Sequence, residues 1–203
     1  SEGVTLGTGK DATLQYDGTN VEMDTQAVGS GLLVVTGSAA VSGVEIDNTA
    51  TDGDPTLAFT LSGTSLFTMG VDDGDSDKFK IGTTAIGTST ALTIDGSQNI
   101  GIGTVDPVST LQVTGTNQVT DTNTPNLFIT VTDSQAINLG GTLGFGIMIG
   151  DGTVLRSLAQ VSGRKDGSSA GNAGGYLTLD TSNNAGTMTE QVRVTVAGDV
   201  GIG

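Results

Sequence analysis

Residues 92–103 read LTI-DGSQN-IGIG, and the closing tripeptide Gly101-Ile102-Gly103 returns 100 residues later as Gly201-Ile202-Gly203. Each copy follows a short alternating segment and a polar turn; before the second copy the chain reads VTV-AGD-V. A fainter third copy, LGTG followed by TLQY, lies within the first 16 residues. Such repetition is typical of chains built from similar blocks in series. The spacing predicts a leading hairpin segment (1–31), a first block (32–103) and a second block (104–203).

The composition argues against an ordinary globular core. Glycine accounts for 33 of the 203 residues, aromatic residues make up only 3%, and Trp is absent. Each large apolar side chain contributes about 1.5–3 kcal/mol when it is fully buried, and here these side chains lie on short Val-, Ile- and Leu-rich segments. Because a self-contained core would be thin, we expect identical chains to supply buried surface in a homo-oligomer.

The charge balance narrows the range of partners. The net charge is −15, from 22 acidic and 7 basic side chains. Binding to a phosphate backbone needs clustered Lys and Arg, and the densest cluster is the pair Arg164-Lys165, so we expect no nucleic-acid partner. No apolar stretch approaches the roughly 20 residues that span a bilayer, so we expect no membrane insertion. The missing initiator Met and the unfinished second motif lead us to expect a fragment of a longer chain.

Alternation with a period of two dominates the sequence, and no sustained helical periodicity is present. The pattern predicts antiparallel strands at 12–16, 32–36, 56–61, 66–71, 78–81, 127–131, 176–179 and 191–196. Six Asp-Gly pairs predict hairpin turns, since both central residues of a type I′ turn need positive φ; YDGTNV at 16–21 is the cleanest example. The chain is therefore predicted to be all-β, with serial small antiparallel units of a sandwich-like or prism-like kind.

The residue types exclude most catalytic chemistry. The chain has no His and no Cys, which removes the usual nucleophile–base pairs and nearly every zinc site. Carboxylate pairs of the glycosidase kind remain, but a sugar-cleaving groove also needs aromatic platforms, and the chain has two Tyr and five Phe. We therefore expect no enzyme. The glycine-rich stretch at 140–146 lacks Gly-Lys-Ser/Thr and a following helix, so we interpret it as a strand packed near another backbone, without a cofactor.

Acidic turns offer weak candidates for calcium. Asp73, Asp75 and Asp77 have the alternating spacing that begins a calcium loop, but the glycine and the distal glutamate of that loop are not at their required offsets. The favoured interpretation is a solvated hairpin tip whose acids point outward and protect a sheet edge. The same interpretation covers residues 52–54.

The repeated tripeptide has two interpretations. Gly101 and Gly103 alternate with Ile102, which places two positions without Cβ on one strand face and an apolar side chain on the other. Glycine weakens a strand unless a close backbone approach requires it, so we favour a block boundary where identical chains meet along a crowded seam. The alternative is a bulge or bend between blocks. Gly201, Ile202 and Gly203 are interpreted in the same way.

Residues 101–113, GIGTVDPVSTLQV, resemble the recurring shaft motif Gly-Ile-Gly-Thr-x-x-Pro-x-x-x-Leu-x-Val of bacteriophage tail fibres, as do the strings at 16–20, 70–81 and 176–194. The resemblance implies a parallel homotrimer, elongated along its threefold axis. Such repeats often lie upstream of an intramolecular chaperone domain, which these residues do not include.

The expected function is therefore a structural shaft segment of a trimeric tail fibre or similar appendage, which supports host attachment from a virion or an extracellular surface. Two alternatives remain open. One is a module that binds a host glycan or protein through the polar loop at 163–175, which carries Arg164 and Lys165. The other is a subunit of a bacterial or archaeal extracellular filament that uses the same repeat.

Overall fold

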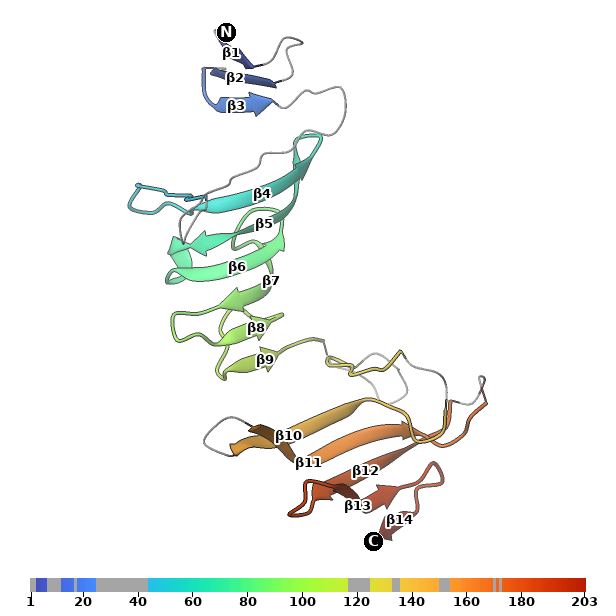
Figure 1. Ribbon diagram of the computed structural model, residues 1–203. Helices are drawn as coiled ribbons and strands as arrows, with labels where there is room; N and C mark the ends of the chain where they lie inside the picture. The colour runs from blue at the N-terminus through green and yellow to red at the C-terminus, as the bar shows by residue number, and fades with distance from the viewer. Residues whose placement is uncertain are drawn as a thin grey trace. The chain divides into compact units, whose positions relative to one another are not determined.

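The computed structural model describes residues 3–6, 12–16, 18–24, 44–116, 125–132, 136–149, 154–169, 171 and 173–203. These residues form strands and turns with a single 3₁₀ turn, η1 (Asp73–Asp75), so the predicted all-β class is confirmed. The strands fall into three antiparallel sheets (Figure 1). The chain divides into two compact units, Ser1–Gln112 and Val113–Gly203.

The smallest sheet is an N-terminal meander of β1 (Gly3–Leu6), β2 (Ala12–Tyr16) and β3 (Val21–Asp24). Tyr16 pairs with Val21, and Gly18 lies in the connecting turn with φ of 104°. The predicted hairpin at 16–21 is therefore present. A glycine fits this turn because positive φ is unfavourable for residues that carry a Cβ.

A six-stranded meander completes the first unit, with each strand paired to the next in chain order (Figure 1). Its strands are β4 (Thr56–Leu61), β5 (Thr64–Asp72), β6 (Lys78–Thr83), β7 (Ser89–Ile94), β8 (Ile100–Ile102) and β9 (Leu111–Val113). A two-residue turn joins β4 to β5, where Ser62 and Gly63 both have positive φ, as a type I′ turn requires.

The second unit contains a five-stranded meander, again in chain order. Its strands are β10 (Thr142–Ile149), β11 (Val154–Lys165), β12 (Gly175–Ser182), β13 (Met188–Val194) and β14 (Val200–Ile202). The glycine-rich stretch at 140–146, which leads into β10, runs close to other backbone, as expected: a Cβ on Gly140 would collide with the Gly163 carbonyl, and one on Gly146 with the Arg156 carbonyl.

The two larger sheets repeat one pairing scheme. The β7–β8 and β13–β14 pairs have registers offset by 100 residues, with Leu92↔Ile102, Thr93↔Gly101 and Ile94↔Ile100 matching Val192↔Ile202, Arg193↔Gly201 and Val194↔Val200. Register shifts also recur at equivalent places, at Phe59/Thr60 and Ile81/Gly82 in one sheet and at Phe145/Gly146 and Leu179/Asp180 in the other. The sequence repeat is thus a repeat of structure.

Several sequence expectations need correction. Residues 127–131 form no strand, and their backbone instead runs beside β10, where the Ile129 carbonyl occupies the space that a Cβ on Gly141 would need. In the Asp-Gly turns after β5 and β7, the positive φ values fall on Ser76, Asp77 and Gln98, because these turns are longer than two residues. The strand expected at 32–36 lies outside the described residues, as do Asp17 and the Asp-Gly pair at 151–152.

Extensive contacts between described strands join neighbours within one sheet. No two described sheets of one unit are stacked through such contacts, so the sandwich-like or prism-like packing stays a prediction about an assembly. The consequence for a single chain is that each large sheet must cover its two faces with its own loops or leave them open.

Candidate functional site

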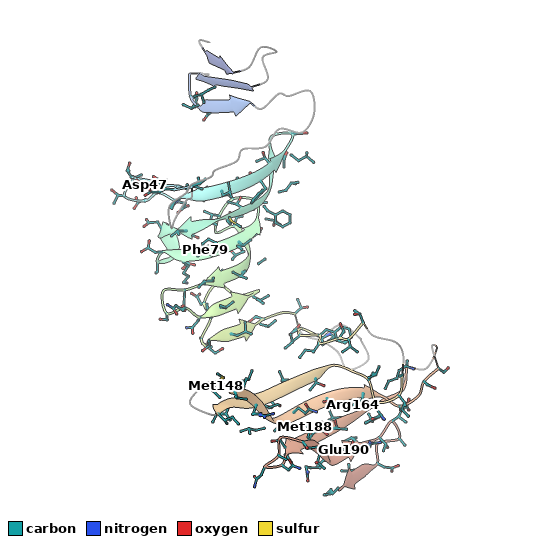
Figure 2. The ribbon with its side chains drawn as sticks, viewed as in Figure 1. Asp47, Phe79, Met148, Arg164, Met188 and Glu190 are labelled. Atoms are coloured by element: carbon teal, nitrogen blue, oxygen red, sulfur yellow. The ribbon has the colours of Figure 1, made fainter. Side chains whose placement is uncertain are left out.

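One face of the six-stranded sheet is apolar, and its side chains are exposed or half-buried. Cross-strand pairing places Leu57, Met69, Ile81, Leu92 and Ile102 in one row across β4 to β8, and a second row runs from Val71 through Phe79 and Ile94 to Ile100. Phe59 and Phe67 face each other at one end of the sheet and are 52% and 55% exposed. We call these eleven side chains apolar face 1. Figure 2 shows Phe79 on β6.

The second unit repeats this arrangement. Its apolar face 2 consists of Leu143, Phe145, Val161, Leu177, Leu179, Val192, Val194, Val200 and Ile202, aligned by the pairing of β10 to β14. Leu177 and Leu179 are each 42% exposed although they lie in the middle of the sheet. Side chains of this kind are normally buried when they occupy central strands.

The opposite faces are polar, and they are closed over their central strands. Thr93, Ser162 and Thr178 are fully buried, and Lys80 is only 3% exposed, whereas Tyr176 is the one buried hydrophobic residue among those described. In the first unit the covering segment is the strap, which we define as residues 104–110. A Cβ on Gly101 would lie 2.6 Å from the Thr104 carbonyl oxygen and 3.5 Å from Pro107, so the strap leaves no room there. Each sheet therefore buries the centre of its polar face and leaves its apolar face exposed or half-buried.

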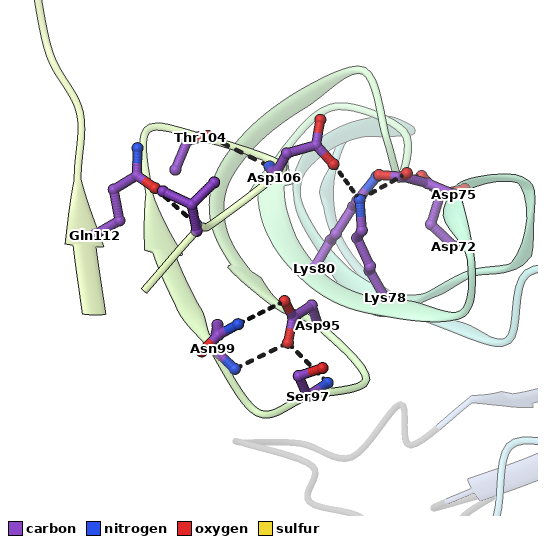
Figure 3. A network of polar contacts seen from close by, with 11 residues as sticks. Asp72, Asp75, Lys78, Lys80, Asp95, Ser97, Asn99, Thr104, Asp106 and Gln112 are labelled. Carbon is purple, nitrogen blue, oxygen red and sulfur yellow. Dashed lines mark hydrogen bonds and ion pairs between the residues drawn. The ribbon is translucent and has the colours of Figure 1, made fainter. Parts of the chain in front are cut away.

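A charged cluster holds the polar face of the first unit together (Figure 3). The Lys80 ammonium donates to Asp72 at 2.7 Å and to Asp75 at 2.5 Å. Lys78 pairs with Asp75 at 2.9 Å and with Asp106 of the strap at 2.5 Å. Because buried charges are stable only when they are paired, these contacts explain how a lysine is accommodated in the middle of a sheet.

The pKa values follow these contacts. Hydrogen bonds from Lys80 and Lys78 lower the pKa of Asp75. Burial opposes the charge on Lys80, but its bonds to Asp72 and Asp75 outweigh that effect and raise its pKa. The pKa of Asp73 is raised, by partial burial and then by the neighbouring Asp77 carboxylate.

The three calcium candidates, Asp73, Asp75 and Asp77, therefore do not point to one common site. Asp75 faces the two lysines, while Asp73 and Asp77 interact with each other at the turn. The Asp73 N–H donates to Asp54 at 2.9 Å, which ties residues 52–54 to the same turn. Within the described residues, no group of three or more His, Cys, Asp or Glu side chains is arranged to hold a metal ion. Lys78 and Lys80 were not among the candidates from the sequence, although their spacing of two residues, directly after the acidic run at 72–77, could have indicated them.

The repeated tripeptide lies in β8 of the first unit, between β7 and β9, and in β14 of the second unit, beside β13. Gly101 pairs with Thr93 and Gly201 with Arg193, while Ile102 and Ile202 lie on the apolar faces and are 44% and 84% exposed. Gly103 has a φ of 72°, so its backbone takes the left-handed conformation directly after β8 ends. The strap of the same chain leaves no room for a Cβ at position 101, so it requires a glycine there. A seam between identical chains at this position stays a prediction.

In the second unit the polar face carries side-chain networks in place of a strap. The Tyr176 hydroxyl donates to Asn138 at 2.5 Å, and Arg193 lies over the Tyr176 ring, 4.2 Å from its centroid. Arg193 also pairs with Glu190 at 2.7 Å, and this contact lowers the pKa of Glu190. Figure 2 shows Glu190 on β13.

The loop at 163–175 was the candidate for ligand binding. It borders a shallow hollow of about 640 Å³ whose lining includes Gly140, Arg164, Lys165, Tyr176 and Leu177. Both cations have partners in their own chain: Arg164 donates to the Asn138 carbonyl at 3.0 Å, and Lys165 donates to the Gly167 and Ser169 carbonyls. These hydrogen bonds hold the loop in place and leave fewer N–H donors of Arg164 and Lys165 free to bind a ligand.

No protein-family model matches the chain, and the search of curated proteins finds none similar to it. In the part of the chain that the structure describes, no helix has the length and apolar character needed to cross a membrane. Function must therefore be inferred from the sheet faces.

Proposed function

We propose that the chain is a structural shaft segment of a homotrimeric tail fibre, or of a similar appendage on a virion or extracellular surface, that supports host attachment. The observation that carries the proposal is the open apolar face on both large sheets, combined with a polar face that is already closed. The threefold order comes from the resemblance to shaft repeats.

Burial energetics favour association through these faces. Removing apolar surface from water contributes roughly 25 cal/mol per Å², and none of the side chains of apolar faces 1 and 2 carries a charge that would oppose burial. A contiguous apolar face of this kind on a soluble protein marks an interaction surface. The repeat presents the same type of face in both units, so identical chains can pair along successive blocks.

The charge distribution fits the same assembly. The net charge of −15 comes from side chains outside apolar faces 1 and 2, so those faces can meet while the rest of the surface keeps the assembly soluble. A structural role also suits the absence of His and Cys, since rigid shafts need packing and hydrogen bonds and no nucleophile.

Sedimentation equilibrium on the 203-residue chain at micromolar concentration tests the proposal. We expect a mass three times that of the 20.2 kDa chain. A monodisperse monomer with a stable fold would contradict it, because the apolar faces would then be stable in water.

The second candidate is a module that binds a host glycan, and the hollow beside Arg164 and Lys165 is the observation in its favour. A glycan array with and without a calcium chelator tests it. Specific binding that is lost in Arg164→Ala would support this role. If no glycan on the array binds, the structural shaft segment remains as the proposed function. Electron micrographs of the parent particle would separate a tail fibre from a cellular filament.

A further inference from the structure

We infer that a hollow at the turn between β12 and β13 binds the carboxylate of an acidic sugar, with Arg156 as the group that holds it. The hollow has a volume of about 270 Å³ and lies among the beginning of β11, the end of β12 and the turn at 183–187 (Figure 1). Its lining is separate from apolar face 2 and from the hollow beside Arg164, so the inference does not depend on either proposed function.

Arg156 is the one basic residue among those described whose side chain has no partner in the chain. Its exposed side chain forms no hydrogen bond or ion pair there, whereas carboxylates or carbonyls hold every other described basic side chain: Lys78, Lys80, Arg164, Lys165 and Arg193. The chain has 22 acidic side chains and 7 basic ones, so a guanidinium without a carboxylate beside it is the exception. The donors of this guanidinium are available to an external anion.

The turn backbone positions this guanidinium at the hollow. Nη1 of Arg156 lies 3.3 Å from the place that a Cβ on Gly186 would occupy, and Cζ lies 3.6 Å from it. Gly186 has a φ of 80°, a conformation that favours glycine, so the turn leaves the space beside which the guanidinium lies. A guanidinium that rests against backbone loses less conformational freedom on binding an anion than one that moves freely in solvent.

Asn183 lines the hollow and adds N–H donors to it. Its side-chain oxygen accepts from the Ala185 N–H at 2.9 Å and from the Thr187 N–H at 3.0 Å. Because a backbone N–H needs an acceptor, these two bonds identify which side-chain atom is the oxygen. The Nδ2 hydrogens of Asn183 are therefore the part of this amide that the turn leaves for a ligand.

The rest of the lining suits an acidic sugar. Ser182 and Asn184 both donate and accept hydrogen bonds, as sugar hydroxyls require, and Leu158 offers an apolar surface for ring C–H groups. No Asp or Glu belongs to the described part of the lining, so no carboxylate there repels an anion. One guanidinium matches the single charge of a planar carboxylate, which it can hold through two parallel hydrogen bonds. A phosphate group carries a larger charge, between about −1.5 and −2.

The test titrates the full chain with sodium galacturonate and follows the Nε–H signals of its three arginines in ¹⁵N–¹H spectra. We expect a saturable shift of one signal, the one missing from the spectrum of Arg156→Gln, and no shift with galactose, which lacks the carboxylate. Calorimetry should show an affinity about tenfold lower or less in Arg156→Gln, since the guanidinium donates both hydrogen bonds. Arg156→Lys keeps the charge without the planar fork and should restore only part of the affinity.

Arg164→Gln is the matched control, because it removes the same charge from the other hollow and should leave galacturonate binding unchanged. Arg156→Gln should unfold at the same denaturant concentration as the parent chain, since Arg156 has no described partner to lose, so that weaker binding reports on the site itself. Sodium phosphate should bind more weakly than galacturonate. Absence of galacturonate binding, binding that Arg156→Gln leaves intact or Arg164→Gln abolishes, or equal affinity for phosphate would each overturn the inference.

Discussion

At the residue scale, the distribution of buried groups is reversed relative to most soluble sheets. Threonine, serine and a paired lysine fill the closed faces, while leucine, isoleucine and phenylalanine side chains are exposed or half-buried on the opposite faces. The Thr90 and Thr93 hydroxyls are buried without a hydrogen-bond partner. Unsatisfied hydroxyls weaken a closed face, since each loses its bonds to water. The ion pairs of Lys80 with Asp72 and Asp75, in contrast, satisfy the buried ammonium on the same face.

Gly101→Ala is predicted to destabilise the first unit without changing the association of chains. Its Cβ would lie 2.6 Å from the Thr104 carbonyl oxygen and 3.0 Å from Thr104 Cγ2. Overpacking of this kind lowers the free energy of unfolding by about 2 kcal/mol. Denaturant unfolding at fixed protein concentration measures the loss, and Gly96→Ala is the control. A variant of normal stability that sediments at a lower mass would instead place Gly101 in a seam between chains.

At the scale of the element, the same turn is built from different side chains. In residues 95–99 the Asp95 carboxylate accepts from the Ser97 and Asn99 N–H groups, each at 2.9 Å. In residues 195–199 the Thr195 hydroxyl accepts from the Asp199 N–H at 3.1 Å. Short polar side chains at the first position of a turn satisfy the backbone that the turn leaves unpaired. The backbone path is therefore the same in both units although the side chain differs.

The turn between β5 and β6 predicts how stability depends on pH. The pKa of Asp75 is lowered in the folded chain, so its contribution is present above the ordinary aspartate value of 3.8 and is lost as the pH falls through the lower folded value. The pKa of Lys80 is raised, so its contribution is lost only as the pH rises above 10.5. We expect a level free energy of unfolding near neutral pH and a fall below about pH 4.

Denaturant titrations at pH 6 and pH 3 measure this difference. Asp75→Asn should reduce the difference between the two pH values, since the variant has no carboxylate to protonate there. Asp73→Asn should leave the acid loss in place or increase it, because the pKa of Asp73 is raised and its protonation favours the folded state. An equal acid loss in Asp75→Asn and in the parent chain would show that other carboxylates dominate.

At the scale of the whole molecule, two units share one pairing scheme and expose equivalent apolar faces. Identical chains are the natural partners for such faces, because each copy brings the same surface in the same order.

Phe59→Asp is predicted to weaken association. Phe59 is 52% exposed on apolar face 1, so a carboxylate there is tolerated in a free chain and is strongly unfavourable when the face is covered. Ala58→Asp is the matched control, since its pairing with Thr68 places it on the opposite face. Sedimentation velocity should show a lower mass for Phe59→Asp alone. Equal masses for both variants would exclude apolar face 1 from the interface.

The all-β class, most strands, the hairpin at 16–21 and the repeat could be predicted from the sequence, because alternation and turn residues act over a few neighbouring positions. The sequence also placed Asp73, Asp75 and Asp77 in one turn, yet the partners of Asp75 were out of its reach, since Lys80 meets that carboxylate only after β5 and β6 pair.

Which face of each sheet is closed could not be predicted from the sequence, because it depends on long-range packing. Alternation shows that a strand has two unlike faces, but coverage depends on where a connecting loop runs. Here the strap crosses the polar side and places Pro107 against Gly101 of β8. Tertiary structure likewise excluded a strand at 127–131, where the local pattern favoured one but no described neighbouring edge pairs with it. A β-strand is stabilised by hydrogen bonds to a neighbouring strand, and that neighbour can lie far away in the sequence.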